Sequence, residues 1–201
     1  MPPRPRYVCQ TCGYASPKWL GRCPDCGEWN SFVAEAAPAG AARPRTPTAP
    51  PAIVALAEIS PDAEPRLATG LGEFDRVLGG GIVPGSLVLI GGEPGAGKST
   101  LMAQVSARVA ERGRTVLYVS GEESARQTRL RAERLGTMPD GVFLLAENDL
   151  DVILQAMTSR APAVVVIDSI QSVYLPDVPS APGSVGQVRE CAGALLRLAK
   201  E

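Results

Sequence analysis

Gly92-Glu93-Pro94-Gly95-Ala96-Gly97-Lys98-Ser99 has the complete spacing G-x-x-x-x-G-K-[ST] of a phosphate-binding loop. Residues 87–90 before it form a short apolar run that predicts a buried strand, and residues 100–112 after it predict a helix closed by Gly113. Because this motif binds phosphate where a strand leads through a glycine-rich turn into a helix, the context favours a nucleotide site over a chance glycine-rich turn.

The loop residues predict how ATP and Mg²⁺ are held. The glycines at 92, 95 and 97 let backbone N–H groups approach phosphate oxygens, and the N-terminus of the following helix adds positive potential. We expect the Lys98 ammonium to reach the β and γ phosphates and the Ser99 hydroxyl to ligate Mg²⁺. The predicted cofactor-binding residues of this segment are Gly92, Glu93, Pro94, Gly95, Ala96, Gly97, Lys98, Ser99 and Thr100.

Two further apolar strands are predicted to end beside carboxylates. Residues 163–168 end at Asp168, which we expect to contact Mg²⁺ directly or from just outside its ligands. Residues 115–120 are followed closely by Glu122 and Glu123, one of which is predicted to orient the attacking water as a general base, because a chain without histidine offers few other bases. The alternative makes both glutamates favourable charges in the first turn of a helix that runs to about residue 135.

Four cysteines predict a zinc site near the N-terminus. Cys9 and Cys12 form one C-x-x-C pair, Cys23 and Cys26 form another, and a glycine follows each pair. Four thiolates suit tetrahedral Zn²⁺, and a segment of roughly thirty residues buries too little apolar surface to fold without it. Two disulfides are the alternative. Since the sequence shows no signal peptide and no apolar run long enough for a membrane span, we expect a cytoplasmic protein with no membrane partner.

The composition excludes a general attraction to nucleic acid. Hydrophobic residues make up 45% of the chain and the formal net charge is −1, so any DNA contact has to be local. The N-terminal segment interleaves aromatic residues with cations, which suits either stacking on single-stranded bases or covering of the metal site, and both interpretations stay open. The aromatic residues are Tyr7, Tyr14, Trp19 and Trp29, and the cations are Arg4, Arg6, Lys18 and Arg22. Cys191, in a helical pattern, is predicted to be a small core residue.

The remaining pattern predicts an α/β fold with two domains. A short strand near residues 142–145 and a helix over 149–160 continue an alternation of strands and helices, which is typical of a parallel sheet. Residues 171–183 predict a loop, followed by a helix from 184 to the last residue. The predicted organisation is a zinc ribbon at 1–33, a flexible linker at 34–52 with five prolines, and a P-loop ATPase core at 53–201.

Together these motifs closely resemble the bacterial RadA (Sms) family of RecA-like ATPases. The phosphate loop alone is widespread, but its combination with a four-cysteine ribbon is much more specific. The other matching segments are C-G-E-W-N-S at 26–31, T-G-L-G-E-F-D-R-V-L-G-G-G-I-V-P-G-S at 69–86, S-G-E-E-S at 120–124, V-V-V-I-D-S-I-Q-S at 164–172 and S-A-P-G-S-V-G-Q-V-R-E at 180–190.

The resemblance implies an ATP-driven motor of recombinational DNA repair that forms a homo-hexameric ring and promotes branch migration on single-stranded or branched DNA. Residues 171–186 would face DNA along the ring axis. The resemblance also implies that Lys98 and Ser99 bind ATP and Mg²⁺ and that Asp168 is the metal-side aspartate. Glu122, rather than Glu123, would be the water-activating glutamate, and Ser169 would be a polar sensor near the γ phosphate.

The sequence departs from the family pattern in its length. Family members continue into further core strands, a K-N-R-F-G motif and a domain resembling that of Lon protease, none of which this sequence contains. We therefore expect an incomplete core with an unpaired strand edge and exposed apolar residues. We expect such a core to keep nucleotide binding even if it has lost ATP turnover. Two other functions stay open: a zinc and nucleotide-binding module that does not hydrolyse ATP, and a KaiC-like signalling ATPase, which is not expected to carry the ribbon.

Overall fold

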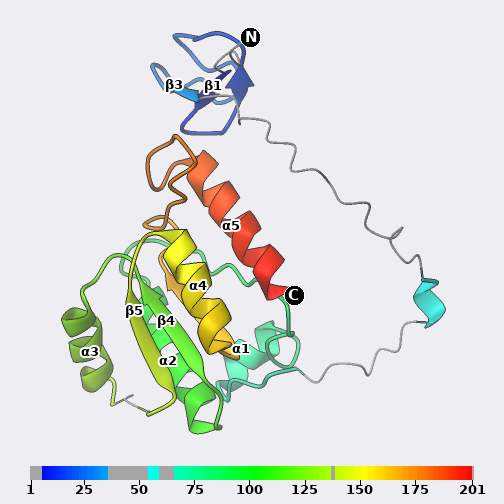
Figure 1. The fold of residues 1–201 in the computed structure, drawn as a ribbon, viewed down its shortest axis with the longest axis vertical. Coiled ribbons are helices and arrows are strands. Elements are labelled where there is room, and N and C mark those ends of the chain that lie inside the picture. Colours follow the sequence, from blue (N-terminus) through cyan, green and yellow to red (C-terminus); the bar gives the residue numbers. More distant parts are fainter. Residues whose placement is uncertain (1–5, 36–53, 59–65, 137–138, 201) are drawn as a thin grey trace. The chain divides into compact units, whose positions relative to one another are not determined.

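The computed structural model describes residues 6–35, 54–58, 66–136 and 139–200 (Figure 1). Contacts within the chain divide it into two compact units, Met1–Pro65 and Arg66–Glu201. The elements are, in chain order, β1 (Arg6–Cys9), β2 (Ala15–Ser16), β3 (Phe32–Glu35), the 3-10 helix η1 (Leu56–Glu58), α1 (Gly72–Val77), α2 (Lys98–Glu111), β4 (Val116–Ser120), α3 (Ala125–Arg134), β5 (Val142–Ala146), α4 (Leu150–Arg160), β6 (Val164–Asp168) and α5 (Val185–Ala199).

The N-terminal unit is built on a small antiparallel sheet with strand order β2-β1-β3. Cys9 at the end of β1 pairs with Phe32 of β3, and both side chains are buried. β3 takes in the first two residues of the predicted linker. The rest of that linker, 36–52, lies outside the described residues, as does Arg4. So short a sheet positions the cysteine loops rather than forming a large core of its own.

The C-terminal unit contains a parallel sheet with strand order β5-β4-β6, which confirms the predicted α/β class. β4 is buried along its whole length, as expected of a central strand covered on both faces. One face packs against α4 and α5, and the other against α2. The buried residues are Leu117, Val119, Leu150, Ile153, Cys191 and Leu195 for the first face, and Val105, Val109 and Val116 for the second. The burial of Cys191 confirms its predicted core position.

The predicted strand over residues 87–90 is wrong for this structure. No strand forms there, and the side chains of Leu87, Val88 and Leu89 are exposed. A β-strand needs a hydrogen-bonded neighbour, and none of the strands among the described residues pairs with this run. The apolar sequence therefore leads into the phosphate loop as irregular backbone, and its side chains are exposed where the sequence predicts burial.

The helix predicted to start at residue 184 has its N-cap there, whereas α3 starts later than the interpretation that places Glu122 and Glu123 in its first turn. Ser124 caps α3 through a capping box with Gln127, and Ser184 caps α5. Since α3 begins at Ala125, Glu122 and Glu123 precede the helix, and the interpretation that places them in its first turn is wrong. α5 ends at Ala199 rather than at the last residue. No helix in the described part of the chain is both long and apolar enough to cross a membrane.

Candidate nucleotide and zinc sites

The four predicted zinc ligands form one cluster. The sulfur atoms of Cys9, Cys12, Cys23 and Cys26 all lie within 4.8 Å of one another. Cys9 Sγ is 3.7 Å from Cys26 Sγ, and Cys12 Sγ is 3.6 Å from Cys23 Sγ. A tetrahedral ion with Zn–S bonds of about 2.3 Å separates its sulfur ligands by about 3.8 Å, so the cluster fits zinc. All five cysteines are free thiols, and the disulfide alternative is wrong for this structure.

Two equivalent turns aim the sulfur atoms inward. The N–H of Gly13 donates to the carbonyl of Cys9, and that of Gly27 to the carbonyl of Cys23, both at 2.9 Å. Gly13 and Gly27 have φ of 79° and 76°, a conformation that side chains disfavour, so a glycine is needed after each C-x-x-C pair.

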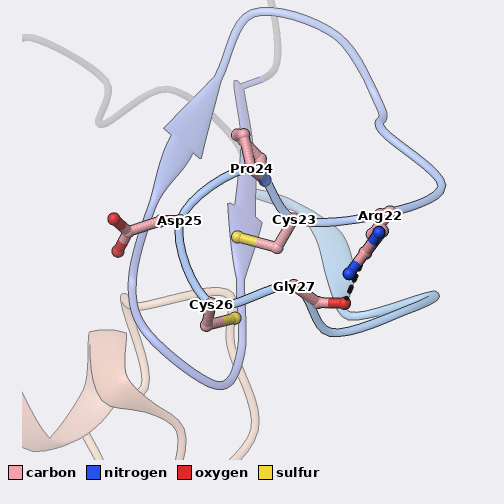
Figure 2. A pocket seen from close by; sticks show the side chains of 6 residues that line it. All are labelled: Arg22, Cys23, Pro24, Asp25, Cys26 and Gly27. Atoms are coloured by element: carbon pink, nitrogen blue, oxygen red, sulfur yellow. Dashed lines mark hydrogen bonds between the residues drawn. The ribbon is translucent and has the colours of Figure 1, made fainter.

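Figure 2 shows the second turn and its surroundings. Arg22 Nε donates to the Gly27 carbonyl at 3.0 Å and thereby ties the ends of the turn together. The Asp25 carboxylate points away from the sulfur atoms of Cys23 and Cys26. Within this turn the inward-facing ligand atoms are therefore both sulfur, which suits Zn²⁺ better than a hard cation.

The thiols do not ionise with equal ease. Burial opposes the Cys9 thiolate, but hydrogen bonds from Ser31 and from backbone N–H groups lower the pKa of Cys9 to about 6. At Cys12 a backbone hydrogen bond from Tyr14 favours the thiolate, yet burial and the adjacent thiols raise its pKa to about 12. Accumulating several negative charges in this small volume requires a bound cation.

The phosphate loop leads into the N-terminus of α2. Gly95 and Gly97 have φ of 80° and 84°, which only glycine adopts readily, and Gly97 is the N-cap of the helix. The first intrahelical bond runs from the Leu101 N–H to the Gly97 carbonyl at 2.9 Å. Gly97 has no side chain that could cap the N–H groups of the first turn. These donors and the helix dipole together make a site for an anion such as phosphate.

Lys98 and Ser99, the last two residues of the loop motif, begin α2 and contact groups on two sides of the site. The Lys98 ammonium donates to the carbonyl oxygens of Gly92 and Glu93, both at 2.8 Å, and so lies over the loop. The Ser99 hydroxyl donates to Asp168 Oδ1 at 3.1 Å, which joins the start of α2 to the end of β6. The predicted Mg²⁺ partners, 69 residues apart in sequence, are thus in direct contact.

The neighbouring glutamates have different partners at this edge of the sheet. Glu122 accepts a hydrogen bond from the Ser169 hydroxyl, which brings the predicted base together with the predicted polar sensor. Glu123 forms an ion pair with Arg131 of α3. The carboxylate of Glu123 is therefore engaged by a cation on an adjacent helix, whereas that of Glu122 is held beside Asp168 by a neutral hydroxyl.

Sequence reasoning missed two residues that contact Asp168. The Tyr118 hydroxyl donates to Asp168 Oδ2 at 2.6 Å, and Arg131 Nη1 lies 3.5 Å from the same oxygen. Burial and the Asp168 carboxylate raise the pKa of Tyr118 well above its ordinary value, so the phenol keeps its proton and donates. A signal for Tyr118 exists in the sequence: it is the polar-tipped residue of an otherwise apolar strand, two positions before Ser120 and therefore on the same face.

Asn148, which follows β5, was also missed. Its Nδ2 donates to the carbonyl oxygens of Gly121 and Ser172, both at 2.8 Å. The N–H of Tyr174 in turn donates to the Asn148 carbonyl at 2.9 Å. Asn148 thereby connects the segment that carries Glu122 to the loop after β6. Its place at the carboxyl edge of a parallel sheet was the available signal, since ligand sites gather there.

A parallel α/β sheet with a phosphate loop, an aspartate and a glutamate at one edge defines a P-loop nucleotide-binding protein, here joined to a four-cysteine zinc ribbon. The comparisons with known families agree. Residues 60–201 match the AAA domain family, and the chain belongs to this family. Residues 7–34 match the rubredoxin metal binding domain.

Curated relatives make the comparison more specific. The chain is 52% identical over 200 residues to the DNA repair protein RadA of Bacillus subtilis and 50% identical over 199 residues to that of Halalkalibacterium halodurans. The RadA protein of Listeria monocytogenes is 49% identical over 197 residues. Each match covers 97% of this chain but only 43–44% of the relative, so the chain spans less than half the length of these proteins. The predicted resemblance to RadA is confirmed.

Proposed function

We propose that this protein is a DNA-dependent ATPase of recombinational DNA repair. The observation that carries the proposal is the 3.1 Å hydrogen bond from Ser99 to Asp168, because it joins the phosphate loop to the strand end beside which Glu122 lies. A loop that holds phosphates, an oxygen pair suited to Mg²⁺ and a carboxylate near both are the parts that nucleotide hydrolysis requires. The similarity to proteins named for DNA repair supports the biological role.

In the proposed mechanism each residue has a separate task. Backbone N–H groups of the loop and the N-terminus of α2 hold the phosphates, and Lys98 compensates their charge. Ser99 and Asp168 would hold Mg²⁺, which neutralises charge that develops on the phosphate oxygens during transfer. Glu122 accepts a proton from the attacking water and orients it, while the Ser169 hydroxyl fixes the rotamer of that carboxylate.

We place the DNA contacts on the loop at 171–186 and on α5, with the ribbon as a second surface. Arg189 and Arg197 are exposed on α5. In the ribbon, Trp19 and Trp29 are 50% and 65% exposed. Tyr7, Leu20 and Phe32 pack around the cysteines, and the two tryptophans lie outside that cluster. The Arg22 guanidinium lies 5.7 Å from the centre of the Trp29 ring, an arrangement of cation and aromatic ring that suits contact with a phosphate and a base. A homo-hexameric ring that promotes branch migration would bring several copies of these surfaces to one DNA molecule.

The experiment that tests the enzyme assignment compares Glu122→Gln with its neighbour Glu123→Gln in the complete reading frame. Both changes remove one carboxylate charge and keep the shape of the side chain. We expect Glu122→Gln to bind ATP as the unmodified protein does and to hydrolyse it about 100- to 10,000-fold more slowly. Glu123→Gln should keep most turnover. An inactive Glu123→Gln beside an active Glu122→Gln would reverse the assignment, and a non-hydrolysing binding module would show no turnover in any form.

A further inference from the structure

The two oxygens of the Asp168 carboxylate have different surroundings. Oδ1 accepts a hydrogen bond from Ser99, the residue expected to ligate Mg²⁺. Oδ2 accepts a hydrogen bond from Tyr118 at 2.6 Å and lies 3.5 Å from the Arg131 guanidinium. Oδ1 therefore faces the start of α2, and Oδ2 is directed into the protein, where it accepts one hydrogen bond, from Tyr118, and lies near the charge of Arg131.

The sheet fixes Tyr118 in this position. In the parallel register of β4 and β6, Tyr118 lies opposite Val166 and Ser120 lies opposite Asp168. Side chains alternate between the two faces of a strand, so the phenol projects from the same face of the sheet as the Asp168 carboxylate. Tyr118 lies two residues before the position opposite Asp168, and its hydroxyl reaches the carboxylate from there. The Tyr118 residue is only 3% exposed, and the packed strand leaves its ring little freedom to leave Asp168.

Arg131 reaches the same oxygen from α3. Its guanidinium also pairs with Glu123, and the side chain is mostly buried between the two carboxylates. Burial acts against the charge, but the ion pair with Glu123 outweighs it and raises the pKa of Arg131, so the guanidinium stays charged. The guanidinium therefore pairs with Glu123 and places a positive charge 3.5 Å from Asp168 Oδ2.

Mg²⁺ and Ca²⁺ place different demands on a carboxylate. Mg²⁺ needs nearly ideal octahedral geometry and takes carboxylate oxygens singly, whereas Ca²⁺ accepts six to eight ligands and commonly binds both oxygens of one carboxylate. A carboxylate oxygen that is directed into the protein and accepts a short hydrogen bond from a buried phenol is disfavoured as a second ligand to a cation. Groups that orient metal ligands in this way typically change metal affinity about 10- to 100-fold when they are removed.

We propose that Tyr118 and Arg131 are positioning residues that reserve Asp168 Oδ1 for the cation and thereby make the site prefer Mg²⁺ over Ca²⁺. The proposal rests on the nucleotide site of the proposed function. The phenol contributes the direct hydrogen bond to Oδ2, and Arg131 adds charge and links the arrangement to Glu123. Removal of the Tyr118 hydroxyl frees Oδ2 from its hydrogen bond, and removal of the Arg131 guanidinium takes away the charge beside it, so either change relaxes the selection for a single-oxygen ligand.

The test measures binding of a fluorescent, non-hydrolysable ATP analogue while free Mg²⁺ or free Ca²⁺ is varied. The quantity compared is the ratio of the Ca²⁺ to the Mg²⁺ concentration that gives half-maximal binding. We expect Tyr118→Phe, which keeps the ring, to lower this ratio about tenfold or more. Arg131→Gln should also lower the ratio. Arg129→Gln is the matched control, because Arg129 lies on the same helix and pairs with Glu133 in an exposed position. Thermal unfolding checks that each variant is folded.

The outcomes separate this proposal from the one on which it rests. A lower ratio in Tyr118→Phe, with the ratio of Arg129→Gln unchanged, supports the positioning role, because a general loss of structure would weaken binding with both cations alike. An unchanged ratio in Tyr118→Phe, while the unmodified protein binds the analogue with Mg²⁺, overturns it. If the unmodified protein binds no better than Lys98→Ala in the presence of either cation, the nucleotide site itself is refuted.

Discussion

Glu122 and Glu123 are adjacent in sequence, yet their carboxylates are bound by groups of different chemistry. The hydroxyl of Ser169 orients Glu122 and brings no countercharge to it. Glu123 is paired with the Arg131 guanidinium, so a cation on α3 occupies its carboxylate. A general base has to contact the water that it deprotonates, and an ion pair obstructs that contact. At the scale of single residues, this difference in partners is the physical reason for assigning the water-activating role to Glu122.

Lys98→Ala should abolish ATP binding at micromolar concentrations. The ammonium is the only cation within the loop sequence itself, and losing the charged partner of a phosphate costs about 2–5 kcal/mol, or about 30- to 4,000-fold in affinity. Equilibrium titration with a labelled ATP analogue measures the effect. Lys200→Ala, which removes an exposed lysine at the end of α5, should bind as the unmodified chain does. Equal affinities for the two variants would show that Lys98 does not contact the nucleotide.

The residues of the site were predictable only where a local sequence pattern marks them. Lys98 and Ser99 belong to one contiguous motif, and Asp168 ends an apolar run of recognisable length. Tyr118 and Arg131 escaped prediction because their roles depend on the sheet register and on the position of α3, which bring together residues 50 and 37 positions away from Asp168. Local pattern does not encode such contacts.

At the scale of elements, α5 holds the loop that precedes it. Gln187, in the first turns of this helix, is 1% exposed. Its Nε2 donates to the carbonyl oxygens of Leu175, Val178 and Ser180 at 3.0–3.1 Å, and its Oε1 accepts from the Leu175 N–H at 2.9 Å. One amide therefore contacts four backbone groups of an irregular segment, with the two Nε2 hydrogens shared among the three carbonyl oxygens.

Gln187→Ala should destabilise the C-terminal unit by about 3 kcal/mol, because it leaves several buried backbone groups without hydrogen bonds. Denaturant unfolding followed by a probe in this unit measures the change. Gln155→Ala, at an exposed position of α4, is the control and should stay within about 0.5 kcal/mol of the unmodified chain. A similar small change in Gln187→Ala would mean that the loop is not held by this side chain.

The ribbon should bind one zinc ion per chain and depend on it for folding. We expect Cys9→Ser to lose the metal and to unfold residues 7–30, since one ligand of four is removed from a unit with little core. Metal analysis after gel filtration gives the zinc content, and nucleotide binding should stay intact because it resides in the other unit. Cys191→Ala, which changes the buried cysteine outside the cluster, should retain the zinc. Zinc in Cys9→Ser at the level of the unmodified chain would contradict the assignment.

Most elements of the core were predictable, and the exception has a clear cause. β4, β5 and β6 have apolar runs of strand length, and Ser124 and Ser184 mark helix starts with their capping side chains. Residues 87–90 carry the same apolar signal but form no strand. Hydrophobic pattern reports what a segment can bury, while a strand also needs a neighbouring backbone, and that requirement is invisible in the local sequence.

At the scale of the whole molecule, the proposed DNA binding has to depend on local cations, because the net charge is only −1. We expect the affinity for a single-stranded oligonucleotide to fall steeply with salt as phosphate contacts release counterions. In the complete reading frame with ATP and Mg²⁺, Arg189→Ala should weaken binding and reduce the slope of log affinity against log salt by about 1 for each phosphate that the variant no longer neutralises. Fluorescence anisotropy across a salt series measures both quantities. An unchanged slope and affinity would remove Arg189 from the DNA path and favour the ribbon.

The most direct test of a DNA-dependent ATPase is the rate of ATP hydrolysis by the complete reading frame with and without single-stranded DNA. We predict that the DNA raises the rate and that Glu122→Gln eliminates the stimulated rate while ATP binding persists. Hydrolysis that is insensitive to DNA, or a stimulated rate that survives in Glu122→Gln, would contradict the assignment of this protein as a DNA-dependent motor with Glu122 at its catalytic centre.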